Sequence, residues 1–276
     1  MTLKEFHKHA MAFSPTPPMP VVFVGHGTPM NAIENNEFVK MWADLGKELP
    51  KPQAILCISA HWETRGTFVT AMENPKTIHD FYGFPRELYA QQYPANGYVE
   101  LADTIREGVQ STIISNDYEW GLDHGSWSVL KHIYPLADIP VVQLSIDHYK
   151  GMQYHYDLGR ELAFLRRKGV LIIGSGNMIH NLRMVQVEGN DFNVEYGYEW
   201  AFELNDLFKN KILAKDHSQL IDYKNVHSSI NMAIPTPEHY VPLLYTLAMQ
   251  EGDEPIRIFN DKVIAGSLSM TSLVIG

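Results

Sequence analysis

The sequence predicts an α/β protein: a single-domain three-layer α/β/α sandwich around a mostly parallel, mixed sheet. Short apolar runs rich in β-branched residues recur along the chain, and stretches with helical periodicity separate them. Near-continuous apolar runs are typical of strands covered on both faces, and strand–helix alternation is typical of parallel sheets flanked by helices. The 276 residues contain no repeat, low-complexity tract or convincing linker, which favours one domain.

Residues 1–20 end in a proline-rich segment and are expected to form an extended lead-in to a domain at 21–276. Each expected strand is a run of apolar, often β-branched residues: 21–24, 54–59, 68–71, 112–114, 140–146, 170–173 and 256–258, with a last one within 268–275. Each expected helix has apolar residues at helical spacing: 36–49, 98–110, 126–134, 155–168, 196–214 and 237–250. In the last helix, Thr236 is expected to cap the N-terminus and Pro237 to occupy the first turn.

Composition argues against several classes of protein. The formal net charge of -10 argues against a general nucleic-acid binder, which would present a basic face. The single cysteine, Cys57, rules out an internal disulfide framework and is expected to be a small buried hydrophobe. No apolar stretch approaches the roughly 18 residues of a membrane span, and the N-terminus lacks the apolar region of a signal peptide. We therefore expect a cytoplasmic protein without membrane partners; the sequence specifies no oligomeric state.

Four of the thirteen histidines lie where an apolar run ends and the chain turns. His26, His61 and His180 each follow an expected strand, and His239 lies near the start of the last expected helix. Ligands of open α/β sheets bind beyond the carboxyl ends of parallel strands, so we expect these histidines to share one crevice. Imidazole suits zinc, iron, copper and nickel, and three protein ligands with open positions are typical of catalytic metal sites. Any one of these histidines alone is more often a solvated loop residue, but together they predict a metal site.

Other residues near these histidines have two interpretations each. The glycines at 25 and 27, on either side of His26, are expected to let the backbone approach a ligand closely. Neither this glycine pair nor a later one continues into a dinucleotide fingerprint, and no P-loop or nucleophile elbow is present. His124 precedes an expected helix, where Asp123 is either a helix cap or part of the site. His148, after another expected strand, is a further candidate.

Seven segments resemble the class III extradiol dioxygenase family, most closely its DOPA 4,5-dioxygenase branch of bacterial and plant proteins. The segments are GHGTPM at 25–30, SAHWETRG at 59–66, TIHDFYGFP at 77–85, LDHGSW at 122–127, IPVVQLSID at 139–147, GSGNMIHNLR at 174–183 and TPEHYVPLLY at 236–245. GSLSM at 266–270 also matches, so the resemblance covers nearly the whole chain. The combination is highly specific, although no single segment is.

The resemblance implies that His26, His61 and His239 are metal ligands. It implies that His180 is either an additional ligand or the acid–base residue beside the metal. Better-known members of the family use two histidines and one glutamate, so the third ligand is a choice between His239 and its neighbour Glu238, and we prefer His239. Four aromatic residues are expected either to line the pocket or to pack in the core: Trp62, Phe81, Tyr82 and Phe84.

The implied activity is the extradiol cleavage of a catechol, either DOPA-like or a related aromatic diol, in the catabolism of aromatic compounds. Both atoms of O2 enter the ring, and the product is a muconic semialdehyde. Fe(II) is the implied working metal, because Zn(II), which similar proteins also hold, has no accessible redox change. His180 is expected to act as acid and base, with His124 second on the substrate side, while Asp123 is expected to fix the tautomer of a neighbouring histidine. A zinc-dependent hydrolase of the same fold and a non-catalytic metal-binding protein are the alternatives.

Overall fold

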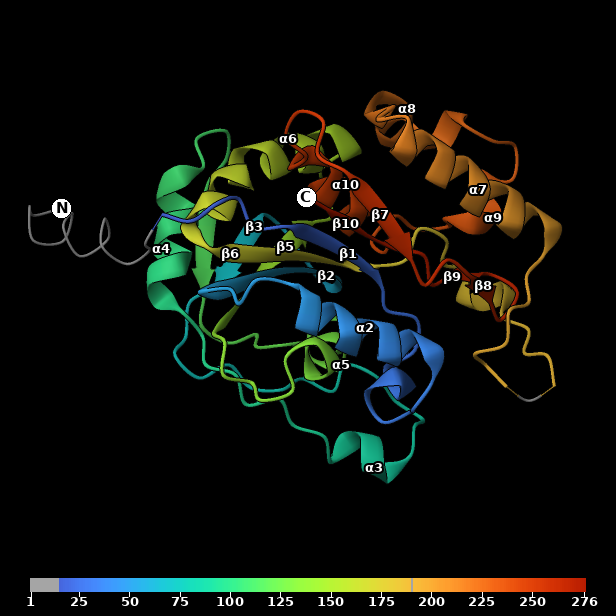
Figure 1. Cartoon of the computed structure of the whole chain (residues 1–276), viewed down its shortest axis with the longest axis horizontal. Coiled ribbons are helices and arrows are strands. Elements are labelled where there is room, and N and C mark those ends of the chain that lie inside the picture. The colour runs from blue at the N-terminus through green and yellow to red at the C-terminus, as the bar shows by residue number, and fades with distance from the viewer. Residues whose placement is uncertain (1–14, 190) are drawn as a thin grey trace, which may run out of the picture.

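An eight-stranded mixed sheet forms the centre of the protein, whose computed structural model describes residues 15–189 and 191–276 (Figure 1). From one edge to the other its strands are β4 (Ile114–Asp117), β3 (Thr67–Thr70), β5 (Val141–Asp147), β2 (Ala54–Thr64), β6 (Val170–Gly176), β1 (Val21–Gly25), β10 (Ser272–Ile275) and β7 (Ile256–Phe259). The central strands β5, β2, β6 and β1 are parallel, whereas β3 is antiparallel to β5 and β10 to β1. These four strands are almost wholly buried, as near-continuous apolar runs predict.

Helices cover both faces of this sheet (Figure 1). One face is covered by α2 (Glu37–Glu48) and α5 (His124–Ile133), whose Trp42 and Trp127 lie in the core cluster on that face. The opposite face is covered by α4 (Val99–Gly108), α6 (Met152–Leu162) and α10 (Val241–Ala248). A third cluster joins α10 to α7 (Glu199–Leu213). The predicted three-layer α/β/α sandwich around a mixed, mostly parallel sheet is confirmed.

Shorter elements connect these layers. They are η1 (Pro29–Ala32), α3 (Arg86–Tyr89), η2 (Ala163–Lys168), η3 (Leu182–Met184), α8 (His217–Ile221), η4 (Tyr223–Asn225), α9 (Ile230–Ala233), β8 (Val263–Ile264) and β9 (Leu268–Ser269). Residues 1–14 of the predicted lead-in, on which the expected lack of a signal peptide depends, lie outside the described residues. After them, the N–H groups of Thr16 and Met19 donate to the carbonyls of Arg167 and Arg166 in η2. None of the helices in the described chain has the length and apolar composition to span a bilayer.

Several element ends differ from those that the sequence predicts. Strand β2 continues to Thr64 and contains an irregularity between Ile58 and Glu63. The last apolar run divides into β9 and β10. The predicted start of the last helix was wrong: α10 begins at Val241 with Pro242 in its first turn, so the segment before it is a turn. Thr236 does not cap this helix, because its hydroxyl donates to Glu238 instead.

Candidate active site

Three adjacent parallel strands bring three of the predicted histidines to one edge of the sheet. His26 follows β1 directly, His61 lies in the irregular end of β2, and His180 follows β6. Strand β6 lies between the other two, so all three strands end side by side. Irregularities of this kind re-aim side chains at strand ends, which suits the position of His61. The Nε2 atoms of His26 and His61 lie 3.1 Å apart.

His239 reaches this edge from the turn before α10. Its carbonyl accepts a hydrogen bond of 2.9 Å from the N–H of Asn177, just beyond β6. A Cβ on Gly176 would overlap that same carbonyl, so only glycine permits this close approach. The His239 ring lies 5.3 Å from the His26 ring and 5.0 Å from the His61 ring, measured between centroids. His180 stacks on His239 at 3.5 Å with an interplanar angle of 9°.

His124 completes the group as the first residue of α5, and Asp80 holds it there. The His124 ring lies 3.9 Å from the His61 ring. One oxygen of Asp80 accepts from the His124 backbone N–H at 2.8 Å, and the other lies 2.8 Å from His124 Nδ1 and 3.4 Å from His61 Nδ1. Asp80 therefore orients two rings at once. Asp80 is not among the site residues predicted from the sequence, although it lies inside a segment that carries the family resemblance.

The donor set fits a cation. Ser175 Oγ lies 2.9 Å from Nδ1 of His26, Asp80 lies beside Nδ1 of His61, and Glu238 lies 3.0 Å from Nδ1 of His239. Partners on Nδ1 leave Nε2 free to bind a metal, which is the usual arrangement around histidine ligands. The Nε2 atom of His239 is buried and has no hydrogen-bond partner among the residues that the structure describes, whereas buried polar atoms rarely lack one. A cation beside this atom would satisfy it.

Metal-binding geometry is available in two neighbouring groups of side chains that share no residue. One ligand atom from each of His26, His61 and His124 lies within 4.8 Å of the others, and the same holds for His180, Glu238 and His239. Ring contacts join the two groups, so five of the predicted histidines lie together: His26, His61, His124, His180 and His239. The structure also keeps Glu238 beside His239, so both choices for the third ligand stand at the same edge.

Burial keeps the imidazoles of four of these residues neutral: His26, His61, His180 and His239. Burial, followed by the neighbouring histidines, holds the pKa values of His26 and His239 well below the usual range. Burial and His124 lower the pKa of His61 in the same way, although Asp80 opposes the shift. Burial lowers the pKa of His180 to about 4, and the charge of His124 adds to this effect. Neutral rings have the free lone pair that metal ligation and proton acceptance require.

A cavity of about 610 Å³ opens over the histidines, with a mostly apolar wall. Its described lining includes aromatic and aliphatic side chains from separate loops: Phe81, Tyr82, Phe84, Leu182, Val185 and Phe192. Three of the four predicted aromatic wall residues therefore line it. Trp62 is buried instead, and its ring stacks on Trp120 at 5.6 Å. The cavity is large enough for a single aromatic ring with a short substituent.

Three expectations about individual residues need correction. Gly25 was expected to let the backbone approach a ligand, but it is required for packing. A Cβ at this position would overlap the backbone of Met270. Asp123 caps α5 and accepts a hydrogen bond of 2.6 Å from Ser59. The carboxylate that lies beside a histidine ring is Asp80, not Asp123. His148 lines a separate cavity of about 160 Å³ and is exposed.

Known proteins are similar to this chain over nearly its whole length. The family model described as the catalytic LigB subunit of aromatic ring-opening dioxygenase matches residues 10–274. A protein of Escherichia coli (strain K12) named 4,5-DOPA dioxygenase extradiol is 47% identical over 262 residues, which cover 94% of this chain and 95% of that protein. The Beta vulgaris protein of the same name is 37% identical over 227 residues, which cover 80% and 83%. The crystal structure of an uncharacterized Escherichia coli K12 protein matches with a TM-score of 0.81 and 43% identity, covering 94% of this chain and 100% of that one.

Proposed function

Because this chain belongs to the family of the catalytic LigB subunit of aromatic ring-opening dioxygenase, we propose that its histidine pocket cleaves a catechol with O2 in the extradiol manner. The observation that carries this proposal is the convergence of buried imidazoles beneath an apolar cavity, with the Nε2 atoms of His26 and His61 facing each other and that of His239 without a partner among the described residues. Such a site can bind a redox metal and an aromatic diol together. The proposed catalytic domain is residues 21–276 of a cytoplasmic enzyme.

We assign the metal to His26, His61 and His239. The unpartnered Nε2 of His239 and the facing Nε2 atoms of His26 and His61 support this choice over one that uses Glu238. Glu238 already lies against Nδ1 of His239, where it orients the ring as an outer carboxylate does. His180, stacked on His239, is close enough to be an additional ligand, but we assign it first to proton transfer.

Fe(II) bound here would supply the redox chemistry and open positions that a catechol and O2 require, which the filled d shell of Zn(II) does not provide. Side chains of the protein would transfer protons and position the substrate. His180 is neutral at pH 7, because its pKa is about 4, so a ring nitrogen can accept a proton from a catechol hydroxyl. The same residue can return that proton when the ring opens. His124, oriented by Asp80, is assigned to the substrate side.

The proposed product is a muconic semialdehyde, which is yellow near neutral pH. The experiment that tests the proposal loads the metal-free protein with Fe(II) without air, adds a catechol, and then admits air. Oxygen uptake together with yellow colour is the expected result. Hydrolysis of esters or amides with zinc alone would favour the hydrolase alternative. The absence of activity in both assays would favour a metal-binding protein without catalysis.

A further inference from the structure

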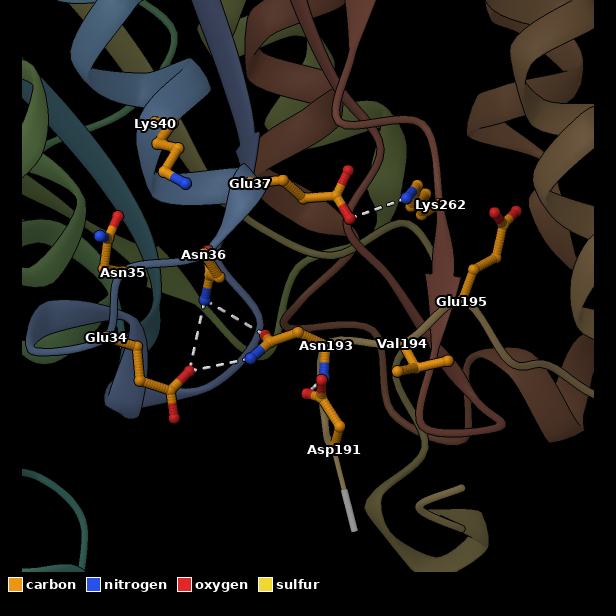
Figure 2. Close-up of a pocket in the computed structure, with 10 residues that line it drawn as sticks. All are labelled: Glu34, Asn35, Asn36, Glu37, Lys40, Asp191, Asn193, Val194, Glu195 and Lys262. Atoms are coloured by element: carbon orange, nitrogen blue, oxygen red, sulfur yellow. Dashed lines mark hydrogen bonds and ion pairs between the residues drawn. The ribbon is translucent and has the colours of Figure 1, made fainter. Parts of the chain in front are cut away.

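Glu34 lies where the histidine cavity meets a second hollow on the surface. It follows η1 closely, is half-buried, and lines both the 610 Å³ cavity and a neighbouring groove. The groove is drawn in Figure 2, where Glu34 lies beside Asn36 and Asn193. A substituent that extends from a ring bound at the histidines toward this groove would pass Glu34.

Two amide side chains fix the carboxylate of Glu34. Its Oε2 accepts hydrogen bonds of 3.0 Å from Asn193 and 3.3 Å from Asn36 (Figure 2). Asn36 is itself held, because its side chain caps α2 through the N–H of Val39 and donates to Asn31 at 2.7 Å. The carboxylate is thus positioned before any ligand arrives, and ordering it costs little conformational entropy on binding.

Among the residues that the structure describes, no cation forms an ion pair with Glu34, although Lys40 and Lys262 line the same groove (Figure 2). Lys262 pairs instead with Glu37 at 2.7 Å. The described lining of the histidine cavity contains no lysine or arginine. Its other carboxylate, Asp80, is already bonded to His124. Glu34 therefore provides the available fixed negative charge on the cavity wall.

We propose that Glu34 is a specificity-determining residue that selects catechols whose ring substituent ends in an ammonium group. The proposal rests on the proposed ring-cleaving function, because the two ring oxygens must lie at the histidines for the substituent to point away from them. An ammonium is attracted by the carboxylate and by aromatic rings, and Phe81 and Phe192 line the same cavity as Glu34. A substituent that ends in a carboxylate is repelled by the negative charge of Glu34, so repulsion of anions adds to the selection for cations.

The test compares three catechols of similar size: dopamine as the cation, 4-ethylcatechol as the neutral reference, and 3,4-dihydroxyphenylacetate as the anion. In the wild-type enzyme, kcat/KM for dopamine is expected to exceed that for the anion by about tenfold or more. Glu34→Gln keeps the shape of the side chain and an acceptor for Asn36 and Asn193 but removes the charge. This variant is expected to reduce the preference to about twofold, mainly through the KM of dopamine, and to leave 4-ethylcatechol within about twofold.

Glu195→Gln is the matched control, because Glu195 lines the same groove but not the histidine cavity. It is expected to keep the wild-type preference. An unchanged preference in Glu34→Gln, or an equal loss in Glu195→Gln, overturns the role of Glu34. Equilibrium binding of dopamine and 4-ethylcatechol without air measures the same selection without turnover. If dopamine binds more tightly than 4-ethylcatechol in a manner that depends on Glu34, but no catechol is cleaved, then the proposed ring cleavage is wrong and the role of Glu34 stands. If both ligands bind equally well, the role of Glu34 is overturned.

Discussion

The two ends of the central parallel strands differ in whether their buried polar side chains have all their hydrogen-bond partners within the protein. At the amino ends lies Arg166, a fully buried arginine in η2. Its nitrogens donate to the carbonyls of Met19 and Met249, both at 2.7 Å, and to both oxygens of Glu254 at 2.8 and 2.5 Å. At the carboxyl ends lie the histidines of the site, where Nε2 of His239 has no partner within the described part of the chain.

The difference separates a structural polar site from one prepared for a ligand. Arg166 has its charge neutralised and all its nitrogens bonded by the protein itself, as a buried ion requires. The histidines instead use Nδ1 for internal bonds and direct the remaining nitrogens toward one another. Nitrogen atoms that form no bond to the rest of the protein are available to bind a ligand. Substitutions at the two ends should therefore change different quantities: catalysis at one and stability at the other.

The largest effect is expected from removal of a proposed metal ligand. His26→Ala should lose bound iron and reduce turnover to that of the metal-free protein, because it removes one of the two facing Nε2 atoms. His180→Ala should keep the metal and lose about 10²- to 10⁴-fold in kcat, the usual contribution of an acid–base residue. Iron content by atomic absorption and oxygen uptake together distinguish the two outcomes.

His148→Ala is the control for these variants, because His148 is exposed and lines a different cavity. It should keep both iron and turnover. Full activity with normal iron content in His26→Ala would contradict the ligand assignment. Loss of iron in His180→Ala would make His180 a ligand rather than an acid–base residue.

At the other end of the strands, Arg166→Met should lower the free energy of unfolding by about 3–5 kcal/mol, because it leaves Glu254 and two carbonyls without their partner. The neighbouring pair Arg167–Glu251 lies at the surface, and Arg167→Met should cost far less than Arg166→Met, because solvent screens an exposed ion pair. Urea denaturation measures both values. If the folded Arg166→Met variant loses catalysis as fully as His26→Ala, the separation of the two ends fails.

The sequence predicts the site best where the information is local. Apolar runs placed the central strands, and the polar residues that follow them placed His26, His61 and His180 at one edge. Strand ends were less predictable: β2 and β6 continue into polar or glycine residues that complete the hydrogen bonding of their neighbours. The start of α10 was misplaced because a proline four residues earlier gave an equally plausible helix start.

The partners of the histidines could not be predicted in the same way. Asp80 lies 44 residues from His124, and Ser175 lies 149 residues from His26. Neither spacing has a local signature, because the pairing depends on how loops fold over the sheet edge. The packing reason for Gly25 depends on Met270 in a similar way. Tertiary contacts, rather than local pattern, decide these roles.

Asp80→Asn tests the outer partners and should have an intermediate effect. The amide keeps the size of the side chain but removes the charge that orients the rings of His61 and His124. Loss of such an outer carboxylate typically costs about 10- to 100-fold in metal affinity or activity. Iron titration and oxygen uptake measure the two quantities. Asp44→Asn, in an exposed ion pair with Lys47, is the control and should change neither; wild-type values in Asp80→Asn would contradict an orienting role.

The smallest effect should come from Glu254→Gln, and it should depend on pH. Partial burial raises the pKa of Glu254, but hydrogen bonds and charge from Arg166 outweigh this and hold it below the usual range. Its stabilising contribution is therefore complete above the unfolded pKa of about 4.3 and is lost as pH falls through the lower folded pKa. We expect the wild type to be more stable than Glu254→Gln at pH 7, because the variant leaves the buried guanidinium of Arg166 without its counter-charge, and by less than the loss in Arg166→Met, because the amide keeps a hydrogen-bond acceptor for Arg166. The difference should shrink below pH 4 in urea denaturation; a difference independent of pH would mean that the charge of Glu254 contributes nothing at this end of the strands.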